Sequence, residues 1–301
     1  MPNVREVALE LGFVEIASRD IERWARFATE IVGMATEVVG PPGGRVLLMR
    51  ADDKRYRVAV RESDEDRFLR TVYRVDGESG LDQLAQRLER ASVRFERLEG
   101  AYLPSGRRGE AFLDFQDPSG HDIRVSWAAP EDSVSPLPSP AGVDFTGHRL
   151  GALGHVVLLV PDLDKSMAFY TECLGFRLTD FIGDGPSRLA FLRCNERHHT
   201  VALMAGAARV DHIMVEFATL DDVARVFDAA RAHPGVVASE LGRHSNDRAI
   251  SFYVRTPLPG LEIEVGTQGI DVGEPWTPDV YASGSIWGHK RILDYPSSPV
   301  G

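Results

Sequence analysis

Histidine and glutamate side chains interrupt three apolar segments of this sequence. His155 precedes VVLLV, His212 precedes IMVEF, and the apolar run LEIEV carries two glutamates, Glu262 and Glu264. An ionised carboxylate is costly to bury unless it is paired or bound to a metal, and imidazole and carboxylate groups together bind divalent metals. The sequence therefore predicts a metal site formed by two histidines and one glutamate.

The two-residue period of a β-strand places these side chains on one face. The opposite faces of the three segments are apolar, with Val156, Leu158, Val160, Ile213, Val215, Phe217, Leu261, Ile263 and Val265. We expect those faces to pack under helices, which leaves His155, His212 and Glu264 on the concave face. Glu262 shares that face with Glu264, so strand alternation does not choose between them.

Two neutral imidazoles and one carboxylate on one side of a metal leave other coordination positions open. This is the facial arrangement of mononuclear non-haem Fe(II) oxygenases, in which substrate and O2 bind the same ion. Zn²⁺ accepts the same ligands in hydrolases. The ligand set alone therefore leaves an oxygenase and a hydrolase as alternatives.

An internal repeat predicts the elements that position these residues. LGFVEIASRDIERWARFATEIVGM from Leu11 aligns without a gap with LGHVVLLVPDLDKSMAFYTECLGF from Leu153, 142 positions later (153 minus 11). Each copy predicts a strand and an amphipathic helix; in the second copy Asp162 is the expected N-cap and Gly175 the expected C-terminal glycine. A further strand and helix unit follows in each half, so the chain is predicted to be an α+β protein of four βαβββ modules.

The two copies differ at the candidate metal-binding positions. Phe13 stands where the second copy has His155, and Arg124 where it has Glu264. An apolar side chain and a cation do not bind a metal, so the site is expected in the second half only. We predict a metal-free N-terminal domain over residues 1–132, a linker rich in Pro and Ser over 133–147, a catalytic domain over 148–272, and a tail over 273–301 that closes the site.

Composition limits the classes of partner. The 301 residues include 34 Lys and Arg against 45 Asp and Glu, a formal net charge of −11. An acidic chain without a basic run is a poor partner for nucleic acid or anionic lipid, and no apolar run approaches the roughly 18 residues of a membrane span. Two cysteines are too few for a disulfide framework and fit the reducing cytoplasm. We expect a cytoplasmic protein that binds neither nucleic acid nor membranes, and we also expect a homo-oligomer.

Over nearly its whole length the chain resembles the type I extradiol catechol dioxygenases of the vicinal oxygen chelate superfamily. The resemblance is carried by LGHVVLLVPDLDKSMAFYTECLGF, CNERHHTVAL, DHIMVEFATLDDV, LGRHSNDRAISFYVRTPLPGLEIEVG and SIWGHKR. It implies two tandem domains that form half-open barrels, with His155, His212 and Glu264 as metal ligands. Glu262 then becomes a wall residue. The resemblance also implies Fe(II), with Mn(II) as the alternative, and O2 as co-substrate.

The same resemblance implies roles for other polar residues. His199 would exchange a proton with the O2-derived group, whereas His198 is expected on the other face of the same strand. His244 and Tyr253 would hydrogen-bond the catechol oxygens and help to deprotonate one of them. These residue types suit the task, because hydrogen bonds favour the anionic catechol and a positioned imidazole delivers a proton. The implied product is a hydroxymuconic semialdehyde, formed by ring opening beside the diol.

Four further positions concern the substrate and O2. Asn246 and Asp247 are expected near the O2 side, with a simple turn dipeptide as the alternative. Phe191, eight residues before His199, matches a position that lines the pocket for the ring substituent, and Gly284 stands where the family has proline. We expect a 3-substituted catechol, such as 2,3-dihydroxybiphenyl or a 3-alkylcatechol, to be preferred over catechol itself.

Two other function classes are weighed against the dioxygenase. A glyoxalase-type lyase or isomerase shares the fold and also takes metal ligands from paired modules, but it has no use for His199, His244 and Tyr253 around an open metal. A drug-sequestering binding protein would need no metal ligands. Ring cleavage of a catechol by the Fe(II)-reconstituted protein would separate the three classes.

Overall fold

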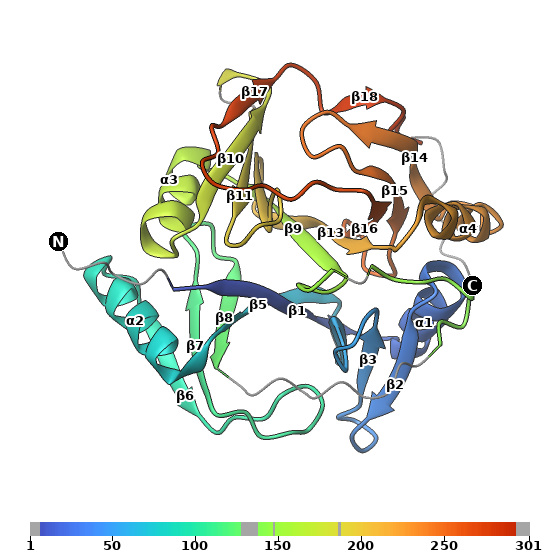
Figure 1. Cartoon of the computed structure of the whole chain (residues 1–301). Helices are drawn as coiled ribbons and strands as arrows, with labels where there is room; N and C mark the ends of the chain where they lie inside the picture. The colour runs from blue at the N-terminus through green and yellow to red at the C-terminus, as the bar shows by residue number, and fades with distance from the viewer. Residues whose placement is uncertain (1–6, 128–137, 147, 186–187, 293–301) are drawn as a thin grey trace.

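The computed structural model describes residues 7–127, 138–146, 148–185 and 188–292, and its two halves lie one above the other in Figure 1. The described elements of the first half are β1 (Leu9–Ser18), α1 (Ile21–Arg26), η1 (Phe27–Val32), β2 (Ala35–Val39), β3 (Val46–Arg50), β4 (Val58–Glu62), β5 (Arg67–Val75), α2 (Gly77–Arg90), β6 (Phe95–Glu99), β7 (Ala111–Gln116) and β8 (Asp122–Trp127). Those of the second half are β9 (Leu153–Val160), α3 (Leu163–Ala168), η2 (Phe169–Cys173), β10 (Arg177–Ile182), β11 (Leu189–Arg193), β12 (Val201–Ala205), β13 (Arg209–Glu216), α4 (Leu220–Arg231), β14 (Val237–His244), β15 (Ile250–Arg255), β16 (Glu262–Thr267), β17 (Asp279–Tyr281) and β18 (Ser285–Trp287).

The described strands form one curled sheet in each half. The first sheet has the order β2-β3-β4-β1-β5-β8-β7-β6, and the second has the order β17-β10-β11-β12-β9-β13-β16-β15-β14-β18. Within a module the first and last strands are parallel, as in β1 with β4 and β13 with β16. The first strands of neighbouring modules pair antiparallel, as in β9 with β13. The predicted α+β fold of four βαβββ modules is therefore confirmed.

The internal repeat extends to local hydrogen bonding. Asp20 and Asp162 cap the first helices of the two halves, and each side chain accepts a hydrogen bond from the backbone N–H three residues later. Both helices continue into a π-helical turn, η1 and η2, and both turns are followed by a glycine with positive φ, Gly33 at 79° and Gly175 at 81°. Because only glycine adopts this conformation without strain, the predicted helix end is explained physically.

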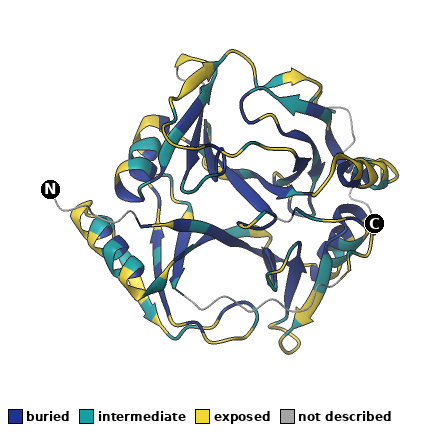
Figure 2. Cartoon of the chain, viewed as in Figure 1, coloured by how far each residue is buried: buried dark blue, intermediate teal, exposed yellow. Residues whose placement is uncertain are grey.

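The apolar core lies between the sheets and their helices. In Figure 2 the strands are mostly buried, whereas the outward faces of α2 and α4 are exposed. On α4, Val223, Val226 and Ala230 are buried, and Phe227 packs edge-on against Phe252 with ring centroids 4.8 Å apart. The 3.6-residue period of the helix explains why these residues share one buried face. Within the described ranges, no helix is long and apolar enough to cross a membrane.

The inside of the first barrel is filled by side chains. Phe13 packs edge-on against Tyr56 at 4.9 Å within a separate apolar cluster, which also contains Val46, Leu48, Ala59, Val72, Leu103 and Phe112. Arg124 is held by two hydrogen bonds to Asp114, each 2.6 Å long. The residues that replace His155 and Glu264 in the first half therefore serve packing and an ion pair.

The segment after β16 contributes to both edges of the second sheet. β17 pairs parallel with β10 at one edge, and β18 pairs antiparallel with β14 at the other. Figure 1 shows this red segment crossing the open side of the upper half. Of the predicted linker 133–147, residues 133–137 and 147 lie outside the described residues, as do residues 293–301 of the predicted tail.

Candidate metal centre and active site

Three neighbouring strands bring the expected metal ligands together. His155 lies on β9, His212 on β13 and Glu264 on β16, which are adjacent in the sheet. Glu264 Oε2 is 3.1 Å from His155 Nε2 and 3.3 Å from His212 Nε2, and the two Nε2 atoms are 3.4 Å apart. His155 and Glu264 are 3% and 1% exposed. One buried carboxylate oxygen and two imidazole nitrogens therefore converge on one point of the concave face.

These donor separations fit a single divalent ion. Metal–nitrogen and metal–oxygen distances of about 2.0–2.2 Å place neighbouring ligands roughly 3.0 Å apart in an octahedron and roughly 3.4 Å apart in a tetrahedron. The observed separations of 3.1, 3.3 and 3.4 Å lie in this range. Three protein ligands leave coordination positions open for other molecules in either geometry. The donor set is thus suited to a catalytic metal.

The buried carboxylate and the imidazoles around it shift one another's pKa values. Burial raises the pKa of Glu264, but hydrogen bonds from three imidazoles outweigh burial and hold its pKa well below the ordinary value. Burial lowers the pKa of His155, and there the effect of burial prevails over that of Glu264. For His212, burial lowers the pKa, but hydrogen bonds to Asp211 and Glu264 raise the pKa to about 9. A metal ion that binds His212 Nε2 would have to displace a proton from this histidine.

The structure separates the two glutamates of β16. Glu262 binds Arg291 through both carboxylate oxygens, at 2.6 and 2.7 Å. Glu264 faces His155 and His212 instead. Both side chains share a strand face, as alternation predicts, but the curl of the sheet directs them to different surroundings.

His244 and Tyr253 adjoin the carboxylate on its other oxygen. His244 Nε2 donates to Glu264 Oε1 at 3.0 Å and lies 3.1 Å from the Tyr253 hydroxyl, while His244 Nδ1 donates to the Gly284 carbonyl at 2.9 Å. Burial lowers the pKa of His244, but the hydrogen bond to Glu264 raises it to about 9. Burial holds the pKa of Tyr253 well above its ordinary value. Both residues thus remain hydrogen-bond donors at neutral pH.

The His199 ring stacks against the ring of His155, one of the expected metal ligands. The centroid of the His199 ring is 4.1 Å from that of the His155 ring and 4.9 Å from that of the Phe191 ring, which it meets edge-on. Burial, followed by the neighbouring His155, lowers the pKa of His199 well below its ordinary value. A neutral imidazole at this position is able to accept a proton.

The expectation for His198 was wrong. His198 and His199 precede β12 in an irregular segment, where successive side chains do not alternate as they do in a strand. His198 Nε2 contacts Asp180 Oδ2 at 2.7 Å, and the Nδ1 atoms of the two histidines are 3.2 Å apart. His198 is therefore a buried neighbour of His199 and not a residue on an opposite face.

The Asn246 and Asp247 side chains are both buried. Asp247 Oδ1 accepts from the Ala249 backbone N–H at 3.0 Å, which is the turn contact, and its Oδ2 lies 3.9 Å from His199 Nδ1. Asn246 Nδ2 has no hydrogen-bond partner among the described residues. Asp247 therefore forms a turn and also faces the site.

Phe191 belongs to a small apolar cluster beside His199. Its buried neighbours are Val157 and Ala202, with Ile182 and Leu189 packed at the margin. A methyl group added to Gly284 would meet only the Ile182 side chain, at 3.9 Å. Gly284 thus borders the same apolar region while its carbonyl orients His244.

Three contacts of the site were not predicted from the sequence. Asp211 holds His212 Nδ1 at 3.0 Å, Asp180 holds His198, and the Gly284 carbonyl holds His244. Asp211 directly precedes His212, so its charge offered a sequence signal. Asp180 and Gly284 are distant in sequence from the residues they hold, and no sequence pattern marks them.

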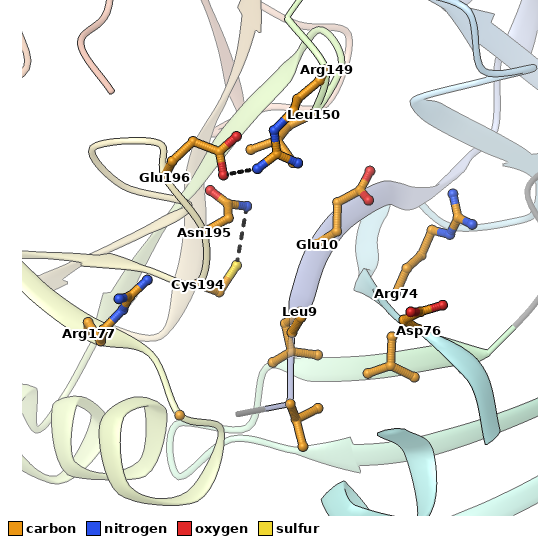
Figure 3. A pocket seen from close by; sticks show the side chains of 14 residues that line it. Leu9, Glu10, Arg74, Asp76, Arg149, Leu150, Arg177, Cys194, Asn195 and Glu196 are labelled. Atoms are coloured by element: carbon orange, nitrogen blue, oxygen red, sulfur yellow. Dashed lines mark hydrogen bonds and ion pairs between the residues drawn. The ribbon is translucent and has the colours of Figure 1, made fainter. Parts of the chain in front are cut away.

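A separate cavity of about 460 Å³ lies between the two halves (Figure 3). Glu10, Arg74, Arg149 and Glu196 line it together with Cys194, and it includes none of the expected site residues. Burial raises the pKa of the Cys194 thiol to about 12, so this thiol is not a reactive nucleophile.

Paired modules around three convergent residues that could hold a metal ion place the chain in a broad class of proteins. The Glyoxalase/Bleomycin resistance protein/Dioxygenase superfamily model matches residues 152–265, and the Dihydroxybiphenyl dioxygenase BphC D1 model matches residues 11–62.

Individual relatives define the family within that class. The chain is 37% identical over 292 residues to a biphenyl-2,3-diol 1,2-dioxygenase of Metapseudomonas furukawaii, covering 94% of each chain. It is 36% identical over 289 residues to a 3-methylcatechol 2,3-dioxygenase of Pseudomonas putida, covering 93% of this chain and 97% of the relative. The structure of 2,2',3-trihydroxybiphenyl 1,2-dioxygenase from Sphingomonas wittichii strain RW1 superposes with a TM-score of 0.84 at 29% identity, covering 95% of this chain and all of that one. The chain belongs to the extradiol ring-cleaving dioxygenases.

Proposed function

We propose that this chain cleaves a 3-substituted catechol with O2 at an Fe(II) ion held by His155, His212 and Glu264. The observation that carries the proposal is the convergence of three buried donor atoms whose separations fit one ion with open positions. The family adds the reaction class. By their names, two relatives act on biphenyl-2,3-diol and 3-methylcatechol, in which the ring substituent is next to the diol.

The metal of such a reaction must take part in electron transfer. An Fe(II) ion held by His155, His212 and Glu264 would supply Lewis acidity toward the catechol and redox chemistry toward O2. Zn²⁺ accepts the same ligands but has no redox chemistry, which makes it unsuitable here. Mn(II) prefers similar hard ligands and is the alternative to Fe(II).

We assign the binding of the catechol oxygens to His244 and Tyr253. His244 contacts Glu264 and the Tyr253 hydroxyl, and Tyr253 is paired with Glu264 in the sheet, so both lie beside the carboxylate that would hold the metal. A pKa of about 9 keeps His244 a donor, and the raised pKa of Tyr253 keeps its hydroxyl proton in place. Such donors favour the anionic form of the catechol.

We assign proton transfer to His199. Its lowered pKa leaves the ring neutral in the free protein, so it is ready to accept a proton from the catechol hydroxyl. It then returns this proton to the oxygen delivered by O2. Asp247, 3.9 Å from His199 Nδ1, is near enough to favour the protonated ring electrostatically.

We assign the ring substituent to the apolar cluster of Phe191, Val157 and Ala202. This cluster directly borders His199 and offers no polar group to a substituent. An alkyl or aryl substituent in this cluster is removed from water, and the burial of its apolar surface contributes roughly 25 cal/mol per Å² to the free energy of binding. A 3-substituted catechol is therefore expected to have a higher kcat/KM than catechol.

O2 uptake tests this function directly. The protein is reconstituted anaerobically with Fe(II), mixed with air-saturated catechol, and followed by an oxygen electrode and by the yellow colour of the semialdehyde. We expect one O2 per catechol, and the highest kcat/KM for 3-methylcatechol or 2,3-dihydroxybiphenyl. Protein loaded with Zn²⁺ is the matched control and should be inactive. No oxygen uptake with any catechol, despite one bound iron per chain, would exclude the proposal.

We also propose the division of the chain into domains at 1–132 and 148–272, joined by the linker 133–147 and followed by the tail 273–301. The described strands of the first sheet end at Trp127 and those of the second begin at Leu153, which supports this division. The homo-oligomeric state and the cytoplasmic location remain predictions. Sedimentation velocity and cell fractionation would check them.

A further inference from the structure

A chain of buried contacts connects the proposed acid–base residue to strand β10. Asp180 Oδ2 is 2.7 Å from His198 Nε2, and His198 Nδ1 is 3.2 Å from His199 Nδ1. The Asp180 and His198 side chains are 0% and 2% exposed. Neither residue has a part in the mechanism given above.

The order of donors and acceptors along this chain follows from the carboxylate. An ionised carboxylate only accepts hydrogen bonds, so the proton of the 2.7 Å contact belongs to His198 Nε2. A His198 ring whose single proton is on Nε2 has an acceptor at Nδ1. The 3.2 Å contact between the two Nδ1 atoms therefore requires His199 to donate from Nδ1, which leaves the lone pair of His199 on Nε2.

We infer that Asp180 and His198 are positioning residues, which hold His199 in the tautomer with its proton on Nδ1 and its lone pair on Nε2. This inference rests on the acid–base role proposed for His199. The free lone pair accepts the catechol proton, while the Nδ1 donor stays bound to His198 whether or not Nε2 carries a proton.

The surroundings hold the chain of contacts rigidly. Asp180 Oδ1 accepts from the Asp279 backbone N–H at 2.8 Å, at the point where β17 pairs with β10. The His198 backbone N–H donates to the Ile270 carbonyl at 3.2 Å. The other acidic group near His199 Nδ1, Asp247, is 3.9 Å away, which is too long for a hydrogen bond. His198 is therefore the acceptor that selects the tautomer.

The first test reverses the hydrogen-bond donors and acceptors between residue 180, His198 and His199 while it keeps the shape of the side chain at position 180. In Asp180→Asn the amide oxygen still accepts from Asp279, so the amide nitrogen faces His198 and donates to Nε2, which reverses both ring tautomers. We expect kcat to fall at least about 10-fold, with iron content and the KM for catechol within about twofold of wild type. Glu274→Gln is the matched control: this exposed tail carboxylate binds Arg177 of β10 and Arg193 of β11, and its kcat should stay unchanged.

The second test separates positioning from packing. His198→Asn keeps an acceptor where Nδ1 was, whereas His198→Phe keeps the ring but has no acceptor. Both variants leave Asp180 without its partner, so their difference reports the contact to His199. We expect the Asn variant to keep a several-fold higher kcat than the Phe variant. A purely structural role predicts the reverse order, because Phe fills the space of the ring.

His199→Gln in the same assay distinguishes the possible failures. If its kcat falls while Asp180→Asn and His198→Phe match wild type, the positioning role is refuted and the role of His199 stands. If His199→Gln itself turns over at the wild-type rate, both the proposed role of His199 and the inference fail. In the His199→Gln background, Asp180→Asn should add no further loss of kcat, because the two residues act as one unit. Full additive loss there would also overturn the inference.

Discussion

Metal binding to this protein should release protons and become tighter as the pH rises from 7 to 9. His212 has a pKa of about 9 in the metal-free site, so it carries a proton at pH 7 that a metal must displace from Nε2. His155 has a lowered pKa and is already neutral there. Displacing one proton from His212 gives about a 10-fold gain in affinity per pH unit between pH 7 and 9.

Asp211 supplies the matched perturbation. Burial lowers the pKa of His212, and the hydrogen bond from His212 Nδ1 to Asp211 at 3.0 Å is the largest effect that raises it. Asp211→Asn removes that charge while an amide oxygen still accepts from Nδ1. The variant should release fewer protons on metal binding at pH 7 and show a shallower dependence of affinity on pH.

Calorimetric titration of the metal-free protein with Mn(II), in buffers of different ionisation enthalpy, measures both quantities. Mn(II) serves as the probe because it resists oxidation during the titration. Wild type should release about one proton at pH 7 from His212, and more if the ion also displaces the proton of His244. An affinity that is flat between pH 7 and 9, or a proton count unchanged by Asp211→Asn, would refute this account of the site.

Four further predictions concern single residues. Glu264→Gln should lose bound iron and activity together, whereas Glu262→Gln should keep both because Glu262 binds Arg291. Elemental analysis measures the iron content and O2 uptake measures the activity. The reverse result would mean that the roles of the two glutamates are misassigned. His199→Gln should keep iron and catechol binding while kcat falls about 10² to 10⁴-fold, and an equal rise in KM instead would point to a binding role. Gly284→Ala should keep kcat/KM for 3-methylcatechol near wild type, because the added methyl group has space and the carbonyl that holds His244 remains. The free energy of unfolding of the metal-free protein, measured in urea, should fall as the pH rises from 6.5 to 9. Folding raises the pKa of His212, so protonated His212 stabilises the fold fully below about pH 6.5, and this contribution is lost as the pH rises through about 9. A constant free energy of unfolding over this range would contradict the prediction.

The fold and the convergence of His155, His212 and Glu264 were predictable because they follow from periodic patterns. The 142-residue repeat marks the modules, and the helix ends at Gly33 and Gly175 confirm it in backbone conformation. Alternation placed His155, His212 and Glu264 on one face, but it left Glu262 beside them. Separating the two glutamates needed either the resemblance or the position of Arg291, which comes from 29 residues further along the chain.

The hydrogen-bond partners of the site were not predictable for a different reason. Asp180 meets His198, and the Gly284 carbonyl meets His244, across separations of 18 and 40 residues. These contacts depend on strand pairing and on a loop that departs from alternation, so neither hydrophobic period nor spacing marks them. The misplacement of His198 has the same origin, because a strand was extended through an irregular segment.

The position of β17 and β18 at opposite edges of one sheet has a consequence for biosynthesis. During synthesis the other strands of the second barrel emerge from the ribosome before residues 279–287. Until those residues emerge, β10 and β14 are unpaired edge strands, and unpaired edges can pair with another chain. The same late segment carries the carbonyl of Gly284 and the backbone N–H of Asp279, which hold His244 and Asp180. A nascent or truncated chain that stops before this segment therefore has β9, β13 and β16 but lacks the contacts that hold His244 and Asp180, so we expect activity only after the last strands have been synthesised.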